Sequence, residues 1–132
     1  MALNGPWGRQ RQPDIPVAVD EIVADGIAAA KAGAAIVHLH AYDENTGRQR
    51  DDWQTYARVI EGIRAQCDVI VYPTIPIAGS GFAGAVTSAR ERYAHLEELA
   101  KRGLVEWAVV DPGSANIARF DELARKKANS AT

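Results

Sequence analysis

The sequence predicts an α/β fold of four consecutive βα units with parallel strands. Short apolar stretches rich in Val and Ile alternate with longer segments of helical periodicity. The stretches 35–40, 69–73 and 107–111 are continuously apolar, which is typical of parallel strands covered on both faces. With 132 residues, 47% of them hydrophobic, the chain can form one domain with a core. A strand is also expected at residues 2–4.

The first helix is expected between residues 18 and 33. Its apolar stripe comprises Ile22, Val23, Ile27 and Ala30. Ala18 stands where a Ser or Thr N-cap would be preferred, while Asp20 and Glu21 favour the positive end of the helix dipole. Lys31 and Gly33 are typical of a helix C-terminus.

Three more helices are expected to follow the later strands. Asp51 or Asp52 can cap the second, whose buried face comprises Trp53, Tyr56, Ala57, Ile60 and Ile63. The third begins near Thr87, buries Ala89, Tyr93, Leu96 and Ala100, and ends before Gly103. His95 lies off this stripe, so we expect it at the surface. The fourth contains Phe120, Leu123 and Ala124.

The length of the repeat suggests a barrel architecture. The strands recur about every 35 residues, and an eight-unit βα barrel has about 250 residues. The chain would therefore form a single, truncated, partial (βα)8 barrel domain over residues 1–132, close to half of a TIM barrel. A small open doubly wound sheet is the alternative. Unpaired apolar edge strands in a half barrel usually require a partner, either a second copy of the chain or a complementary half.

Composition excludes several functional classes. The net charge of −2 gives no basic surface for nucleic acid. No apolar run is long enough to cross a membrane, and the N-terminus lacks the core of a signal peptide, so a cytoplasmic protein is expected. Cys67 is the single cysteine and is expected to be a small buried hydrophobe.

The stretch GAAIVHLHAYD, residues 33–43, is the strongest functional signal. Because side chains alternate along a strand, His38 and His40 are expected on one face, at the carboxyl end where βα folds place their chemistry. Two neutral imidazoles so placed can bind a divalent metal such as zinc. The alternative is a pair of hydrogen-bonded core histidines. Asp43 and Glu44 follow in what we expect to be a solvated loop.

Other segments offer weaker candidates. GSGFAG, residues 79–84, matches a dinucleotide-binding pattern with Asp111 as the ribose-binding acid, but its first glycine follows the strand too late; a loop over the barrel mouth is the simpler interpretation. Asp111, Ser114 and Asn116 stand after the last strand and are substrate-binding candidates. Arg9 and Arg11 would meet an acidic substrate or lie at the surface.

Several stretches together resemble a known family. ALNG, RQPDIP, GAAIVHLHA, IEGIRAQCDVIVYPT and EWAVVDPGSANI occur in the order found in the N-terminal half of the β-keto acid cleavage enzymes, also called 3-keto-5-aminohexanoate cleavage proteins. The resemblance implies a (βα)8 barrel, commonly oligomeric, with Zn²⁺ held by His38, His40 and a glutamate from later in the barrel. It also implies acyl exchange between a β-keto acid and acetyl-CoA, giving acetoacetate and an acyl-CoA.

The sequence departs from the family at informative positions. Trp7 replaces an acidic residue, Tyr42 replaces an arginine, and PTIP replaces a Ser-Thr-Gly-Gly run, which leaves Thr74 to bind a substrate carboxylate. The catalytic residues are expected in the missing half, so the chain should not be competent alone. The prediction is a zinc-dependent β-keto acid cleavage enzyme. The alternatives are a non-catalytic half-barrel assembly or metal-binding subunit, and a dinucleotide-binding protein.

Overall fold

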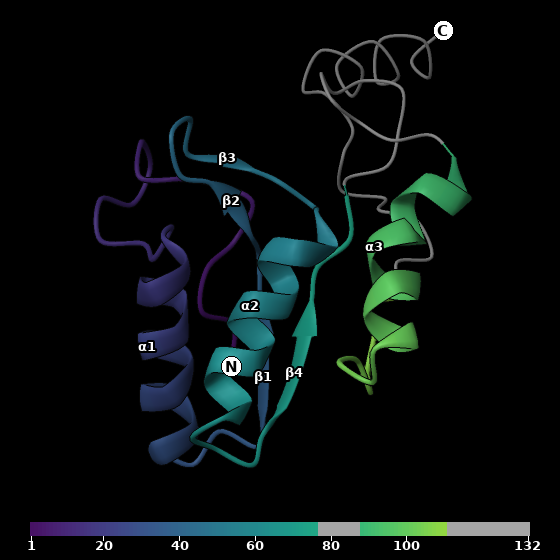
Figure 1. Cartoon of the computed structure of the whole chain (residues 1–132). Coiled ribbons are helices and arrows are strands. Elements are labelled where there is room, and N and C mark those ends of the chain that lie inside the picture. The colour runs from purple at the N-terminus through teal and green to yellow at the C-terminus, as the bar shows by residue number, and fades with distance from the viewer. Residues whose placement is uncertain (77–87, 111–132) are drawn as a thin grey trace, which may run out of the picture.

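The computed structural model describes residues 1–76 and 88–110 and confirms the α/β class (Figure 1). The elements, in chain order, are α1 (Val19–Lys31), β1 (Ile36–Leu39), β2 (Tyr42–Asp43), β3 (Arg48–Gln49), α2 (Trp53–Arg64), β4 (Ile70–Pro73) and α3 (Ala89–Lys101). None of the described helices is long and apolar enough to span a membrane. Helices thus alternate with the two longer strands, as consecutive βα units do.

The strands are parallel, as predicted. β1 pairs with β4 in a register that places His38 opposite Tyr72. On the other side of β1, Ala2 forms a parallel bridge with His38, supported by hydrogen bonds from Leu3 N to His38 O at 3.0 Å and from His38 N to Met1 O at 2.8 Å. The expected strand at residues 2–4 is therefore reduced to a bridge. The spatial order follows the chain order, which is the arrangement of consecutive strands in a βα barrel.

Each strand has one face covered by helices. Val37, Leu39 and Val71 are fully buried in the core formed with α1 and α2, which lie side by side over the strand pair (Figure 1). The alternate residues His38 and Tyr72 lie on the opposite face and are half-buried. Among the described residues, helices therefore cover one face of the strand pair, and the histidines lie on the other face.

The α1–α2 interface requires close backbone approach. A Cβ added at Gly26 of α1 would lie 2.3 Å from Ile63 Cδ1 of α2, and one added at Gly62 would lie 2.9 Å from Val23 Cγ2. Glycine at these two positions therefore lets the helices approach until Val23 and Ile63 fill the space between them.

The helix starts follow the predicted capping logic. The Glu21 carboxylate accepts hydrogen bonds from Val17 N and Ala18 N, both 3.0 Å, which fixes the chain entering the helix. These backbone donors hold the pKa of Glu21 below its usual value. Ala18 offers no side-chain cap, and the Glu44 carboxylate accepts from Val19 N, the first N–H of the helix, at 3.3 Å. Asp52, one of the two predicted caps of α2, accepts from Thr55 N at 3.0 Å.

The buried face of α3 differs from the prediction. His95, Leu96 and Leu99 are buried, whereas Ala89 and Ala100 are exposed and Tyr93 is only half-buried. The expectation of a surface His95 is wrong: it is 4% exposed, and its ring stacks on Tyr56 of α2 with centroids 5.3 Å apart. The predicted stripe was therefore only partly right, because the contact with α2 buries His95 and Leu99 together with Leu96.

The predicted strand over 107–111 is not present in its described part. Residues 107–110 are in no strand, and Trp107 and Val110 are 51% and 81% exposed. The preceding segment is held instead by the ion pair between Arg64 and Glu106, at 2.6 Å. An apolar run becomes a strand only when an edge pairs with it, which its sequence does not determine. Asp111, Ser114, Asn116, the predicted fourth helix and GSGFAG lie outside the described residues.

A hairpin replaces the expected solvated loop after β1. β2 and β3 are antiparallel, with Tyr42 opposite Gln49 and Asp43 opposite Arg48. The Asp43 carboxylate accepts from Asn45 N at 3.0 Å and Thr46 N at 2.9 Å, and Gly47 turns the chain with φ of 64°. Strands of two residues with polar side chains give no apolar periodicity, so the sequence pattern did not reveal them.

Candidate metal site at the carboxyl end of β1

The two histidines of GAAIVHLHAYD meet at the carboxyl end of β1. Their ring centroids lie 5.2 Å apart with the rings nearly perpendicular. The hairpin β2–β3 lies at the end of the sheet toward which β4 points, so it flanks this position (Figure 1). The alternation predicted from sequence therefore brings the two imidazoles together on one face.

The position of His40 is fixed through both its backbone and its ring. The Asn4 side chain accepts from His40 N at 2.7 Å and donates to His40 O at 3.0 Å, as a neighbouring strand would. The ring Nδ1 lies 2.8 Å from Gln49 Oε1 of β3. His40 is 8% exposed, so both interactions are largely shielded from water.

His38 is held differently. Its ring lies 4.7 Å from the Tyr72 ring, centroid to centroid, across the β1–β4 pair. Among the described residues, no group makes a hydrogen bond with the buried His38 Nδ1. The Tyr72 backbone partly offsets the lowering of the His38 pKa, but it makes no hydrogen bond with Nδ1. A buried imidazole nitrogen without a partner is unusual and is a natural position for a ligand.

Both histidines are neutral at physiological pH. Burial lowers the pKa of His38 to about 4, and the neighbouring His40 adds to this effect. Burial also lowers the pKa of His40, although Gln49 and Asp51 oppose the shift. Neutral imidazoles keep a lone pair for coordination, so no proton has to be displaced when a metal binds.

The residue types present suit zinc, which prefers nitrogen and sulfur ligands, but they are too few to complete a zinc site. Two imidazoles on one face offer nitrogen ligands, and His38 carries the nitrogen without a partner. Within residues 1–76 and 88–110, no three His, Cys, Asp or Glu side chains gather as a metal site. Asp43 caps the hairpin turn, and the Glu44 carboxylate accepts from Val19 N of α1 at 3.3 Å. The described donors therefore amount to the histidine pair.

Thr74 lies beside this pair. Its backbone N donates to Leu39 O at 3.0 Å, which continues the parallel register by one residue and places Thr74 alongside His40. Its carbonyl accepts from His95 Nε2 at 2.8 Å. The only hydrogen bond described for its hydroxyl is a long one, 3.4 Å, to Ile75 O. The backbone of Thr74 is thus held on both sides, and Thr74 is 8% exposed.

Trp7 and Tyr42, two residues that depart from the family resemblance, both interact with the first loop, and the Tyr42 hydroxyl also lies 3.4 Å from the Trp7 carbonyl. The Tyr42 hydroxyl donates to the Gly5 carbonyl, which ties the hairpin to the first loop, and burial raises the pKa of this hydroxyl. The Arg11 guanidinium lies 4.1 Å from the centre of the Trp7 ring. Arg9 forms an ion pair with Glu21 at 2.5 Å. Both arginines thus have partners within the chain, as expected for surface residues.

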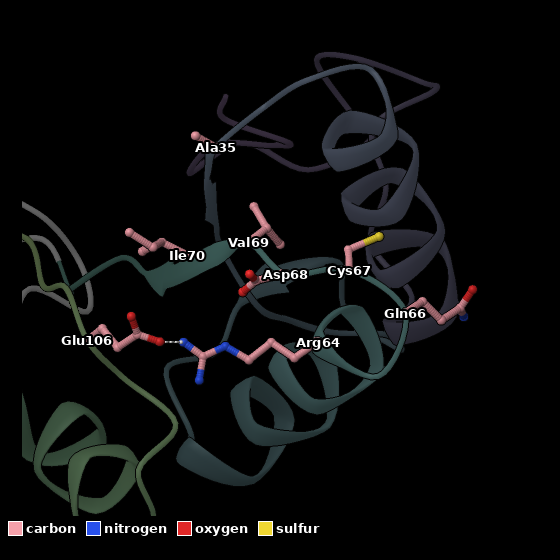
Figure 2. Close-up of a pocket in the computed structure, with 8 residues that line it drawn as sticks. All are labelled: Ala35, Arg64, Gln66, Cys67, Asp68, Val69, Ile70 and Glu106. Carbon is pink, nitrogen blue, oxygen red and sulfur yellow. Dashed lines mark hydrogen bonds and ion pairs between the residues drawn. The ribbon is translucent and has the colours of Figure 1, made fainter.

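A separate depression opens at the opposite end of the strands (Figure 2). Its volume is about 620 Å³, and its lining residues are Ala35, Arg64, Gln66, Cys67, Asp68, Val69, Ile70 and Glu106. The ion pair between Arg64 and Glu106 spans it. βα folds carry out their chemistry at the carboxyl ends of the strands, so the histidine pair, rather than this depression, is the candidate functional site.

The comparisons with known proteins identify the family of the chain. The family model for beta-keto acid cleavage enzyme matches residues 1–131. The 3-keto-5-aminohexanoate cleavage enzyme of Fusobacterium nucleatum is 37% identical over 83% of this chain and 36% of its own length. The 3,5-dioxohexanoate:acetyl-CoA acetone transferase of Paraburkholderia graminis is 31% identical over 87% and 34%, respectively.

A third relative extends the same pattern. The 3-dehydrocarnitine:acetyl-CoA trimethylamine transferase of Rhizobium meliloti is 34% identical over 81% of this chain and 39% of its own length. The chain thus spans a little over a third of the length of the curated relatives it matches. The family model nevertheless covers nearly all of its residues. The chain therefore belongs to the beta-keto acid cleavage enzyme family.

Proposed function

We propose that this chain provides the zinc-binding βα units of an enzyme that transfers acyl groups between a β-keto acid and acetyl-CoA, giving acetoacetate and an acyl-CoA. The observation that carries the proposal is the contact between the neutral rings of His38 and His40 at the carboxyl end of β1. The names of two relatives, which join a 3-oxo compound to acetyl-CoA, support the reaction class.

The chain's own residues account for binding and orientation. His38 and His40 would hold the metal, which when bound supplies Lewis-acid stabilisation of negative charge on a ketone oxygen. Asn4 and Gln49 keep His40 in place, and Tyr72 confines the His38 ring. Low exposure around His40 limits water, which strengthens each charge interaction there.

Substrate binding is assigned to the end of β4. The Thr74 hydroxyl would donate to a substrate carboxylate, because the backbone of Thr74 is held by Leu39 and His95 while its hydroxyl has only a long internal bond. The family resemblance implies an arginine at the position of Tyr42, whose buried hydroxyl is already bonded to Gly5. We therefore assign to this chain a substrate whose far end is neutral or apolar. The residues that transfer protons are assigned to other parts of the barrel.

Metal content tests the site. The purified chain should bind zinc detectably by calorimetry, more weakly than a complete site because two histidines are an incomplete ligand set, and the His38→Ala, His40→Ala double variant should lose this binding. His95→Gln is the matched control, because His95 is the third histidine of the sequence and its nitrogen bonds Thr74 instead. Equal zinc binding in the double variant and the wild type would refute the site. Acyl exchange is followed by mass spectrometry of acyl-CoA products over a panel of β-keto acids.

The sheet edges favour assembly as a second property. In the described part of the chain, β4 hydrogen-bonds to β1 alone, and residues 107–110 do not pair with its free side. Among the described residues β4 thus has an unpaired parallel edge, and Val110 is an exposed apolar residue. Such features favour pairing with further strands, supplied by a second copy or by a complementary half. Association without zinc binding would support the non-catalytic alternative.

A further inference from the structure

We infer that Gln49, Asp51 and Tyr56 form a relay that holds His40 in the tautomer whose Nε2 is offered to a metal. This inference rests on the proposed zinc site. It concerns positioning residues, which act through His40 rather than on the substrate. They come from β3, from the segment after it and from α2, so the relay links the hairpin to the helix layer.

The relay begins at the fully buried Tyr56. Its hydroxyl donates to Asp51 Oδ1 at 2.8 Å. Burial raises the pKa of Tyr56 well above its ordinary value of 10.0, so the hydroxyl keeps its proton and acts as a donor. The Asp51 carboxylate is therefore fixed at one end by a rigid aromatic side chain.

The Asp51 carboxylate in turn sets the orientation of Gln49. Gln49 Nε2 donates to both carboxylate oxygens, at 3.0 and 2.9 Å. Rotating the amide by 180° would place its oxygen against two other acceptors, which is unfavourable. The amide oxygen Oε1 must consequently face away from Asp51, toward His40.

The orientation of Gln49 decides the protonation of the His40 ring. Oε1 lies 2.8 Å from His40 Nδ1 and can only accept a hydrogen bond, so Nδ1 carries the proton. In a neutral imidazole the lone pair is then on Nε2. Because Asn4 also holds the backbone of His40 at its N and O atoms, the direction of Nε2 is fixed as well.

The hairpin shows why Gln49 can reach this position. Gln49 pairs with Tyr42, two residues beyond His40, so the return strand passes alongside the end of β1. Arg50 N also donates to Ala41 O at 2.9 Å. The β2–β3 hairpin is therefore the element that brings an amide to the histidine, and Asp43 and Gly47 shape its turn.

The test compares His40 tautomer and zinc affinity in wild type and Gln49→Leu. In metal-free wild type, ¹H–¹⁵N NMR of the imidazole should show the proton on Nδ1. Gln49→Leu should show mixed tautomers and bind zinc about 10 to 100-fold more weakly. Gln54→Leu is the matched control, because Gln54 is exposed on α2, and it should change neither measurement.

A rescue variant separates positioning from a general structural role. In the double variant Gln49→Glu, Asp51→Asn, the new carboxylate accepts from His40 Nδ1 while the new amide donates to it and accepts from Tyr56. Its zinc affinity should return to within about 3-fold of wild type, whereas Asp51→Asn alone should bind more weakly because the Gln49 amide can then rotate.

The outcomes distinguish the relay from the metal site. Wild type that binds no zinc overturns the proposed site and this inference with it. If wild type binds zinc, then equal affinity in Gln49→Leu, a proton on Nε2 in wild type, or no recovery in the double variant overturns the relay and leaves the proposed function standing.

Discussion

Lowering the pH below neutrality should destabilise the chain through His38. Burial lowers the pKa of this ring from its ordinary value of 6.5 to about 4. Between these two values the unfolded chain binds a proton that the folded chain does not. The free energy of unfolding therefore falls as the pH falls through this window, and the full contribution is present above pH 6.5.

The size of the effect follows from the shift. Each unit of pKa corresponds to about 1.4 kcal/mol, so the complete shift corresponds to roughly 3 kcal/mol. From pH 7 to pH 5, which crosses only part of this window, His38 should lower the free energy of unfolding by about 2 kcal/mol. Burial also lowers the pKa of His40, so His40 too should reduce the free energy of unfolding as the pH falls.

Urea denaturation at pH 7, 6 and 5 in the presence of a chelator measures this loss. His38→Phe serves as the comparison, since it keeps an aromatic ring against Tyr72 but cannot titrate. From pH 7 to pH 5, the free energy of unfolding of His38→Phe should fall by about 2 kcal/mol less than that of wild type. Parallel pH profiles, or an NMR titration of the His38 ring with a midpoint near 6.5, would refute the assignment of a buried, neutral His38.

Three further outcomes are expected. Gly26→Ala should lower stability by about 1 kcal/mol, because its Cβ would lie 2.3 Å from the Ile63 side chain; a raised urea midpoint would contradict the close α1–α2 packing. His95→Leu should cost about 1 to 3 kcal/mol, because the Thr74 carbonyl loses its buried donor, and thermal unfolding at the wild-type midpoint would argue against that bond. Light scattering should show self-association, because β4 pairs on one side only among the described residues, and a stable compact monomer would count against it.

Local pattern alone predicted a large part of the fold. Alternation along β1 places His38 and His40 on one face, and this depends only on the period of two in an extended chain. The bounds of α1 followed from its apolar stripe and from the glycine after it, since φ of 101° at Gly33 suits that residue. Continuous Val and Ile runs correctly indicated parallel pairing of β1 with β4.

The errors occurred where a choice depended on a distant partner. His95 was expected at the surface, and only the position of Tyr56 and Thr74 makes its buried place favourable. Residues 107–110 are apolar enough for a strand but lie unpaired, because pairing depends on an available edge as well as on composition.

The sequence by itself therefore determined that His38 and His40 share one face, since strand geometry alone brings them together. Only the tertiary structure decided how they are held. Asn4 lies 36 residues from His40 along the chain, and Gln49 reaches it through a hairpin with no apolar signal. The physical reason is that periodicity reports which face of an element is buried, whereas a polar side chain finds its hydrogen-bond partners through the register of separate segments.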